Sequence, residues 1–525
     1  MEKHVDGCEG WTSKTPPPTR SSSSDPRHYI RPHTTRMRTT ILTVTAFVAC
    51  VPAFVTPLTP KAQHALAVQQ PQLGRRMAAS STSFAPKAAR TASGLVMTSA
   101  TLEAAGGGTP SSGTGVTPSI INLFKNIVGS GVLALAAGVA AFSGSPLALL
   151  PSLAILLAVG AASAYTFSTI ARVGAATGGS TYKETWAKVF GEKTAFITDA
   201  TTIFMCACAG LSYSIIIGDS FASIAKLAGF TGVFASPNAW IIFLSTCVLL
   251  PLSLLRDLSA LAIGSVIGTA GTLYTALFVF LRLFDKSYQV GGKFNLAIAE
   301  SMRPVFSAPT AARPLFNPSM FVLVSMLASA FLAHYNAPKF YNELEAPADG
   351  SPKLGRFNFV VAAAFGAAAA LMGSVMAGGF LTFGSSANGL ILNNYATSDP
   401  LAFLARLGIG MSIIFSYPLN FVGLRDGVLS IAGKAEQGKK NSVHVAITLA
   451  LMLLMNGTSL FIKDLGLIVG LGGAILGSAL VYIYPALMAA CEKSGAMGKA
   501  EKLMNWGLTG LGVFFAGLGA AMCLK

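Results

Sequence analysis

The first long hydrophobic segment of this chain reads Asn122-Leu-Phe-Lys-Asn-Ile-Val-Gly-Ser-Gly-Val-Leu-Ala-Leu135. It contains a lysine, two asparagines and the run Gly129-Ser130-Gly131, which a plain membrane anchor would not need. Glycine weakens a helix by about 1 kcal/mol relative to alanine, and lipid offers no water to backbone groups that a helix break would free. Such a break is tolerated where protein buries it or where it lines a cavity, as in the substrate sites of transporters. The segment therefore predicts a functional interruption of the helix.

The composition of the 525 residues is that of a membrane protein, with 52% hydrophobic residues, 11% charged residues and a mean hydropathy of +0.60. Ordinary soluble domains carry about 25% charged residues. The net charge of +16 is accounted for by an N-terminal leader and by loops. No arginine-rich helix, RNA-binding signature or zinc-finger spacing accompanies it. We therefore expect an all-α polytopic membrane protein whose partner is the lipid bilayer and not a nucleic acid.

Eleven hydrophobic stretches after the Gly/Ser/Thr-rich linker 104–116 are long enough to cross a hydrocarbon core of about 30 Å. They lie near 119–141, 145–171, 195–218, 238–255, 258–283, 317–340, 357–383, 399–423, 443–462, 465–490 and 504–523. Loops after even-numbered spans hold more Lys and Arg than most opposite loops, although the longer loop 282–315 holds five. By the positive-inside rule, the N-terminus and the even-numbered loops face the cytosol-equivalent side.

The spans divide into two halves of similar length, 119–283 and 317–490, with an additional helix at 504–523. Because each half has an odd number of spans, the two halves run in opposite directions, which is the geometry of a five-plus-five inverted repeat with its site at the midplane. We therefore expect span six to be broken as span one is. Its segment Ser329-Ala-Phe-Leu-Ala-His-Tyr-Asn-Ala-Pro338 contains a proline, which cannot donate a backbone hydrogen bond.

Residues 1–116 form a leader ahead of the membrane domain at 117–525. Segment 37–53 has the basic start, short apolar run and small residues of a signal peptide, and 54–102 has the basic, Ser-rich and acid-free composition of a transit peptide. Together they resemble the two-part presequence of algae with secondary plastids, if translation starts at Met37. The alternative is a disordered cytosolic tail. The expected membrane is accordingly that of a plastid, and otherwise a vacuolar or plasma membrane.

A series of motifs along the membrane domain resembles the amino acid/auxin permease family of secondary transporters. In chain order they are Asn122 to Leu133, Gly179-Ser-Thr-Tyr182 with Phe190-Gly191, Pro251-Leu-Ser-Leu-Leu-Arg-Asp-Leu258, His334-Tyr-Asn-Ala-Pro-Lys-Phe-Tyr-Asn-Glu-Leu344, Phe380-Leu-Thr-Phe-Gly384, Leu392-Asn-Asn-Tyr395, Asp399-Pro400, Ser416-Tyr-Pro-Leu419 and Tyr484-Pro485. The resemblance implies the bundle of the wider transporter superfamily, with broken helices one and six. It also implies amino acid movement coupled to an ion.

The chain departs from the family pattern at two places near the first interruption. Many members have a proline shortly after the glycine pair, where this chain has Ala136 and Ala137, so span one is expected to be less sharply broken. Lys125 stands where the sodium-coupled animal branch has an asparagine and where proton-coupled members often carry lysine. An ammonium about 4 Å from a sodium ion would repel it by about 4 kcal/mol at an effective dielectric of 20. The expected coupling ion is therefore the proton, with sodium as the alternative.

The backbone around the first interruption is the expected substrate site. If span one unwinds at Val128–Val132, the half-helix that follows presents free N–H groups to a carboxylate. The residues expected to bind an amino acid are Ile127, Val128, Gly129, Ser130, Gly131, Ser329, Phe331 and Tyr213. Two alternatives stay open: the glycines serve close helix packing, and Tyr213 is an interfacial aromatic residue instead of a gate or pocket wall.

Several polar residues inside the spans are candidates for coupling transport to an ion. Ionisable groups within a membrane are costly and mark functional sites. The candidates are Asn122, Lys125, His334, Ser412 and Ser416. Four of them have a structural alternative: His334 caps the broken helix, Lys125 reaches toward the cytosolic face, and the two serines allow helix packing. Arg406 and Asp199 lie near span ends and are expected to anchor helices or to pair between them.

No cofactor, metal site or enzyme motif is expected. Cys206 and Cys208 are two residues apart on a helix and point to different faces, so they are interpreted as small buried residues. The sequence has no metal-spaced His/Glu pair, nucleophile elbow or Walker loop. The leading hypothesis is a proton-coupled amino acid symporter, and the alternative of another class is an amino acid sensor that signals to a cytosolic partner.

Overall fold

The protein is described here by a computed structural model that covers residues 113–256, 262–310, 314–347 and 352–525. Within these ranges the chain is helical, and its β-type pairing is limited to two isolated bridges. The leader expected at 1–116 lies outside the described residues except for its last few positions, so the expectations for a signal and transit peptide stay predictions.

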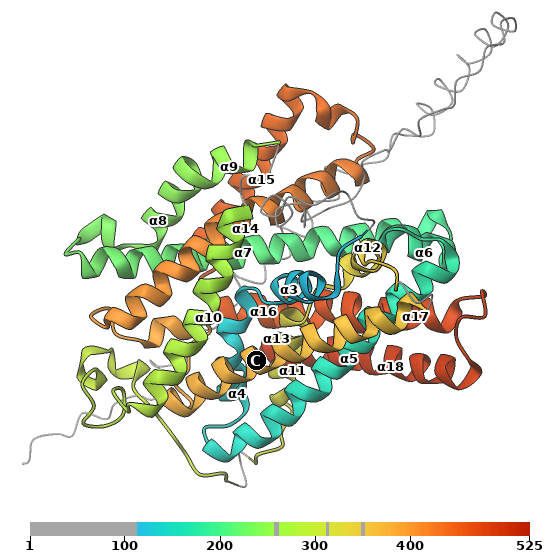
Figure 1. Ribbon diagram of the computed structural model, residues 1–525. Coiled ribbons are helices and arrows are strands. Elements are labelled where there is room, and N and C mark those ends of the chain that lie inside the picture. Colours follow the sequence, from blue (N-terminus) through green and yellow to red (C-terminus); the bar gives the residue numbers. More distant parts are fainter. Residues whose placement is uncertain (1–112, 257–261, 311–313, 348–351) are drawn as a thin grey trace, which may run out of the picture. The chain divides into compact units, whose positions relative to one another are not determined.

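The helices form the expected series of membrane spans (Figure 1). Ten helical segments of the described chain are long and apolar enough to cross a membrane, and a pair bent by 49° makes an eleventh. Spans one to five are α3 (Val116–Ile127) with η3 (Ser130–Ala134) and α4 (Leu135–Phe142); α5 (Leu149–Thr177); α7 (Phe196–Leu227); α8 (Pro237–Leu244) with η7 (Ser245–Leu249) and α9 (Leu250–Leu254); and α10 (Ala262–Phe284).

The second half repeats this order. Its spans are α11 (Met320–Ala330) with η11 (His334–Asn336) and α12 (Ala337–Glu343); α13 (Lys353–Phe383); α14 (Pro400–Ile431); α15 (Asn441–Phe461); and α16 (Leu465–Gly472) through η14 (Gly473–Gly477) and η15 (Ala479–Ile483) to α17 (Tyr484–Cys491). The additional helix is α18 (Lys499–Cys523), and α6 (Tyr182–Phe190) and η12 (Ile391–Asn394) lie between spans. The expected fold class, an all-α polytopic protein of five plus five spans and one more with breaks in spans one and six, is confirmed.

Spans three and eight extend furthest beyond the ends that the hydrophobic pattern predicts. Span three continues to Leu227 and span eight to Ile431, beyond the expected ends at 218 and 423. The extra turns carry charged residues that find partners in the protein. Arg425 donates from Nη1 to the Ser253 carbonyl at 3.0 Å, for example. A hydropathy pattern ends a span too early at such residues because it cannot register these contacts.

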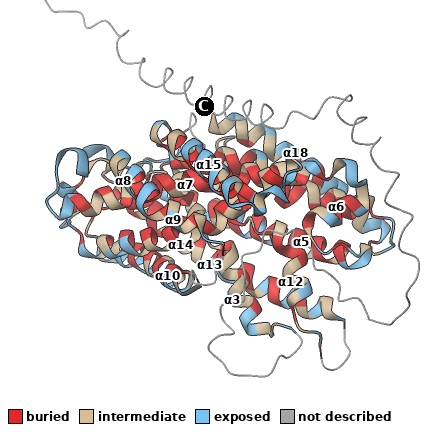
Figure 2. Cartoon of the chain, turned by 90° about the horizontal axis from the view of Figure 1, so that it is seen from above, coloured by how far each residue is buried: buried red, intermediate tan, exposed pale blue. Residues whose placement is uncertain are grey.

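The core lies where the helices face one another, and the apolar outer surfaces are exposed (Figure 2). Span eight packs along spans three and five, and a Cβ added at Gly408 of α14 would lie 2.9 Å from Gly271 Cα of α10. On the outside, Leu150 of α5 is 71% exposed and Leu453 of α15 is 77% exposed, as residues in contact with lipid would be. The buried and exposed faces therefore suit a bundle surrounded by lipid.

The start of span one and the end of span six lie at the same end of the protein. Thr114 N donates to the Glu343 carbonyl at 2.7 Å, and Glu345 N donates to the Thr114 carbonyl at 3.0 Å. This is the end that the positive-inside rule assigns to the cytosol-equivalent side. It gives a reference direction for the site described below.

Candidate substrate site at the helix breaks

Span one is interrupted at the glycine-rich segment. Helix α3 ends at Ile127, and Val128 and Gly129 have extended backbone angles of −79°/98° and −122°/−163°. Helical structure resumes at Ser130, so the break is shorter than the expected stretch Val128–Val132. The first hydrogen bond of the new helix joins Val132 N to the Gly129 carbonyl. The N–H groups of Ser130 and Gly131 consequently have no acceptor within the helix, and the helix dipole adds a partial positive charge there.

Span six is interrupted at a corresponding place. Helix α11 ends at Ala330, the chain turns through Phe331 to Ala333, and η11 begins at His334. Pro338 lies in the first turn of α12, where its missing N–H costs nothing. The position of the proline therefore allows the second half-helix to start directly after the break.

The two interruptions contact each other. A Cβ added at Gly131 would lie 3.3 Å from Ala330 Cα, so the backbones of spans one and six approach closely there. On the side of α3 and α12, Asn336 Nδ2 donates to Asn126 Oδ1 at 3.4 Å. The two breaks that the sequence predicts therefore lie next to each other and form one site.

A cavity of about 190 Å³ opens at this site, between the broken spans and spans three, five, eight and ten. Of the expected residues, those that line it are Lys125, Ile127, Val128, Gly129, Ser130, Gly131, Tyr213, Ser329, Ser412 and Ser416. A Cβ added at Gly129 would meet no atom within 4 Å, so this glycine faces open space. A cavity of this volume holds several waters and therefore has room for a small ligand.

Three expected residues do not line the cavity. Asn122 lies on α3, one turn further from the break than Asn126. The Phe331 side chain is fully buried and stacks on Phe365, with ring centroids 6.0 Å apart. His334 is also fully buried, and its Nε2 lies 2.9 Å from Thr166 Oγ1 and 3.0 Å from the Ser163 carbonyl oxygen. The turn at the span-six break directs these last two side chains toward spans two and seven instead of into the cavity.

Several lining residues were not anticipated. They include Asn126, Cys206, Cys208, Ser212, Thr272, Tyr335, Asn336 and Asn420. Tyr335 and Asn336 belong to the same interruption as His334, which is a signal that could have found them. Asn420 follows Pro418 on α14, and its Nδ2 donates to the Cys206 carbonyl at 2.8 Å. The described residues contain no group of three or more metal-ligating side chains.

The cavity carries little charge. In the part of the chain that the structure describes, Lys125 is the one charged lining residue, and no aspartate or glutamate lines the wall. The other lining side chains are apolar or neutral and polar. An amino acid whose side chain carries a positive charge, in addition to its α-ammonium group, would therefore find no compensating carboxylate in this wall.

The cavity extends from the breaks toward the end of the protein where α3 begins and α12 ends. On that side its wall includes Lys125, Asn336 and Asn420. Toward the other end, the buried turn η12 contacts η3. Asn393 of this turn donates from Nδ2 to Asp219 Oδ2 of α7 at 2.8 Å. The cavity is thus covered at one end and reaches toward the end assigned to the cytosol-equivalent side.

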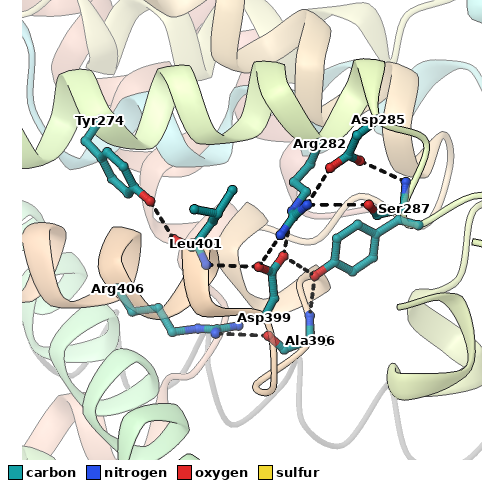
Figure 3. Close-up of polar contacts among 9 residues, drawn as sticks. Tyr274, Arg282, Asp285, Ser287, Ala396, Asp399, Leu401 and Arg406 are labelled. Atoms are coloured by element: carbon teal, nitrogen blue, oxygen red, sulfur yellow. Dashed lines mark hydrogen bonds and ion pairs between the residues drawn. The ribbon is translucent and has the colours of Figure 1, made fainter. Parts of the chain in front are cut away.

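A buried ionic cluster holds the covering segment in place (Figure 3). Asp399 is fully buried and accepts hydrogen bonds from Arg282 Nε at 2.9 Å and Nη2 at 2.6 Å, from Tyr288 Oη at 2.8 Å and from Leu401 N at 3.0 Å. Arg406 donates to the carbonyls of Leu392, Tyr395 and Ala396. Arg406 is accordingly an anchor, as expected, and Asp199 pairs with Lys183 at 2.5 Å.

The fold and the cavity at paired helix breaks define the class of protein: a membrane transporter with many spans. Residues 112–524 match the family described as transmembrane amino acid transporter protein. The chain belongs to this family, which is one of transporters and not of enzymes.

Individual relatives cover most of the membrane domain. The chain is 26% identical over 410 residues to a putative sodium-coupled neutral amino acid transporter 11 of Danio rerio, covering 78% of this chain and 86% of that one. It is 26% identical over 294 residues to vacuolar amino acid transporter 5 of Schizosaccharomyces pombe, covering 55% and 65%. The crystal structure of MhsT in complex with L-phenylalanine has a TM-score of 0.46 and 13% identity, covering 77% of this chain and 98% of that one. As a family member, this integral multi-pass protein moves amino acids across a membrane.

Proposed function

We propose that the chain is a secondary active symporter that carries neutral amino acids by alternating access. The observation that carries this proposal is the cavity at the two helix breaks, with Gly129 open to it and no acidic residue in its described wall. A relative named a neutral amino acid transporter supports the substrate class. Because the described wall has no carboxylate to compensate a positively charged side chain, the cavity also disfavours cationic amino acids.

The substrate backbone would be held by main-chain groups at the breaks. Its carboxylate would accept hydrogen bonds from the N–H groups of Ser130 and Gly131 and from the Ser130 hydroxyl, beside the positive end of the helix. Its ammonium would meet carbonyl oxygens near Ile127 and Ser329, where the first half-helices end. Because every amino acid has these two groups, this part of the site is independent of the side chain.

The proposed coupling ion is the proton. Lys125 lines the same cavity as Ser412 and Ser416, whose hydroxyls would otherwise suit a cation. A fixed ammonium near them would repel a sodium ion by about 4 kcal/mol at 4 Å and an effective dielectric of 20. Sodium is the second candidate because several relatives, including the one from Danio rerio, are named sodium-coupled.

Uptake into vesicles with pH and sodium varied independently tests this coupling. We expect uptake of a labelled neutral amino acid to accelerate under an inward proton gradient without sodium and to collapse with a protonophore. Lys125→Asn should introduce a dependence on sodium, whereas the matched Lys125→Arg keeps the charge and should not. Uptake by the native chain that needs sodium and ignores the proton gradient would reject proton coupling and leave the substrate proposal intact.

The membrane to which the protein is delivered is a separate proposal. The composition of residues 37–102 supports delivery to a plastid, while a vacuolar relative supports a vacuolar membrane as the alternative. A fluorescent fusion with translation forced to start at Met37 tests it. Fluorescence at the vacuolar or plasma membrane would reject delivery to a plastid.

A further inference from the structure

Asp219 of span three contacts the segment that covers the cavity. Its Oδ2 accepts a hydrogen bond of 2.8 Å from Nδ2 of Asn393, which belongs to the covering turn η12. Asp219 and the cavity-lining Ser212 lie on the same face of α7, about two turns apart. Asp219 also directly follows the hydrophobic stretch expected at 195–218. It therefore lies between the cavity and the covered end of the protein.

A second carboxylate at the covered end has a different kind of partner. Asp399 accepts two hydrogen bonds from the Arg282 guanidinium (Figure 3). A proton on Asp399 would leave this cation without its counter-charge, which is costly in the interior of a protein. The partner of Asp219 is instead the neutral amide of Asn393. Asp219 can therefore bind a proton without leaving a buried charge unpaired.

The charged groups around Asp219 leave its bond to the cover in place. Among the described residues, Lys226 of the same helix and Lys463 at the end of span nine act on it electrostatically. Helix α8, which packs against α7, has no titratable side chain. Arg406 of α14 donates to carbonyls of η12, and Asp464 caps the N-terminus of α16. The contact with Asn393 is therefore the direct link between the charge of Asp219 and the cover.

The charge on Asp219 sets the strength of this link. A hydrogen bond to an ionised carboxylate is about twice as strong as one between neutral groups. Protonation of Asp219 therefore weakens the contact between span three and the cover. Because the two equilibria are linked, protonation of Asp219 and opening of the cover favour each other.

We propose that Asp219 binds the proton that drives transport, and that its ionised form keeps the cover closed. This inference rests on the proposed function, because it names the coupling group of the same cycle. A proton from water at the covered end adds to a carboxylate oxygen of Asp219, and the cover opens to the substrate. After the bound substrate has closed the cover, the proton leaves to water in the cavity. The carboxylate then again accepts the hydrogen bond from Asn393, as in the structure.

Two transport assays with the full chain in vesicles test the proposal, both with a labelled neutral amino acid that the native chain transports. Accumulation under a proton gradient requires the carboxylate to release its proton in every cycle, whereas exchange of labelled for unlabelled substrate does not. Asp219→Asn keeps the size of the side chain and imitates the protonated form. Asp199→Asn is the matched control, because Asp199 lies on the same helix and pairs with Lys183 far from the cover.

We expect Asp219→Asn to lose gradient-driven accumulation by about tenfold or more, as removal of a proton-relay group would. Exchange should stay within about threefold of the native chain, because the cavity itself is unchanged. Asp199→Asn should keep both activities within about twofold, since partly exposed ion pairs contribute little. Native accumulation by Asp219→Asn would overturn the proposal. Loss of both accumulation and exchange in a folded Asp219→Asn would overturn it as well.

Asn393→Ala provides a second test that leaves the carboxylate in place. This variant should still accumulate substrate, but the ionised carboxylate can no longer hold the cover. The ratio of uptake at acidic pH to uptake at neutral pH should therefore fall by about threefold to tenfold, as the loss of one hydrogen bond would predict. An unchanged ratio would overturn the role of the Asp219–Asn393 contact, even if Asp219→Asn failed to fold. A native chain that accumulates no amino acid under a proton gradient would instead contradict the proposed coupling ion.

Discussion

The two helix breaks look alike in sequence but present different groups to the cavity. At the span-one break, consecutive residues from Lys125 to Gly131 line the cavity, and Gly129 faces open space. At the span-six break, Phe331, Ala333 and His334 are fully buried in the protein, and the cavity contacts alternate with them along the chain. Span one therefore offers mainly backbone, whereas span six offers selected side chains on a packed support.

The span-one break is suited to binding the substrate, whereas the span-six break is suited to holding side chains in position. Glycine lets a ligand approach the backbone closely, so the span-one break suits groups that all amino acids share. The span-six break has aromatic rings and a histidine packed behind it. We conclude that a substitution at Gly129, which faces open space, should act on transport with little effect on stability. Substitutions behind the span-six break should act on stability first.

The largest expected effect is the loss of uptake in Gly129→Val. The added side chain has room, so the protein should fold with a melting temperature close to that of the native chain, but it fills the place proposed for the substrate carboxylate. Labelled amino acid uptake should fall to background. Gly131→Val is the matched comparison: its Cβ would contact Ala330 of span six, and overpacking should lower the stability by about 1–3 kcal/mol. Normal uptake by Gly129→Val would remove the substrate site from the span-one break.

The second-largest effect is expected at Asp399, in the buried ionic cluster that holds the segment covering the cavity. Asp399→Ala leaves the Arg282 guanidinium and the Tyr288 hydroxyl without their shared acceptor, and removal of one partner of a buried ion pair costs about 3–5 kcal/mol. Thermal unfolding in detergent should show this loss. The control is Lys439→Ala, which removes a surface pair with Glu436 whose side chains are 72% and 81% exposed, and should change stability by less than about 1 kcal/mol. Similar melting temperatures for the two variants would contradict the role of the cluster.

The smallest of these effects is expected for His334→Ala, behind the span-six break. It removes a buried ring and its contacts with span two, which should lower stability by about 2–3 kcal/mol. Because the side chain lies outside the cavity wall, the dependence of the remaining uptake on a proton gradient should be unchanged. Uptake that persisted but no longer responded to the gradient would instead make His334 the proton site and erase the distinction between the two breaks.

Much of the architecture could be predicted from the sequence because the bilayer restricts what a chain can do. Hydrophobic length fixes the number of spans, and the odd number of spans per half fixes their opposite direction. Ten of the thirteen expected site residues line the cavity. Two of the three misses have a common cause. Phe331 and His334 share an interrupted segment with Ser329 and Tyr335, and no helical period applies across a break, so the sequence could not say which side chains turn inward.

The sequence by itself indicated a polytopic membrane protein with paired interruptions in spans one and six, because glycine and proline weaken a helix and lipid offers no water to the backbone groups that a break frees. The tertiary structure alone decided what each interruption presents. Gly129 is open because no neighbouring helix approaches it, and His334 is enclosed because spans two and seven do approach it. Which side chains reach a cavity depends on contacts between helices that lie far apart in the chain, and the local sequence does not specify those contacts.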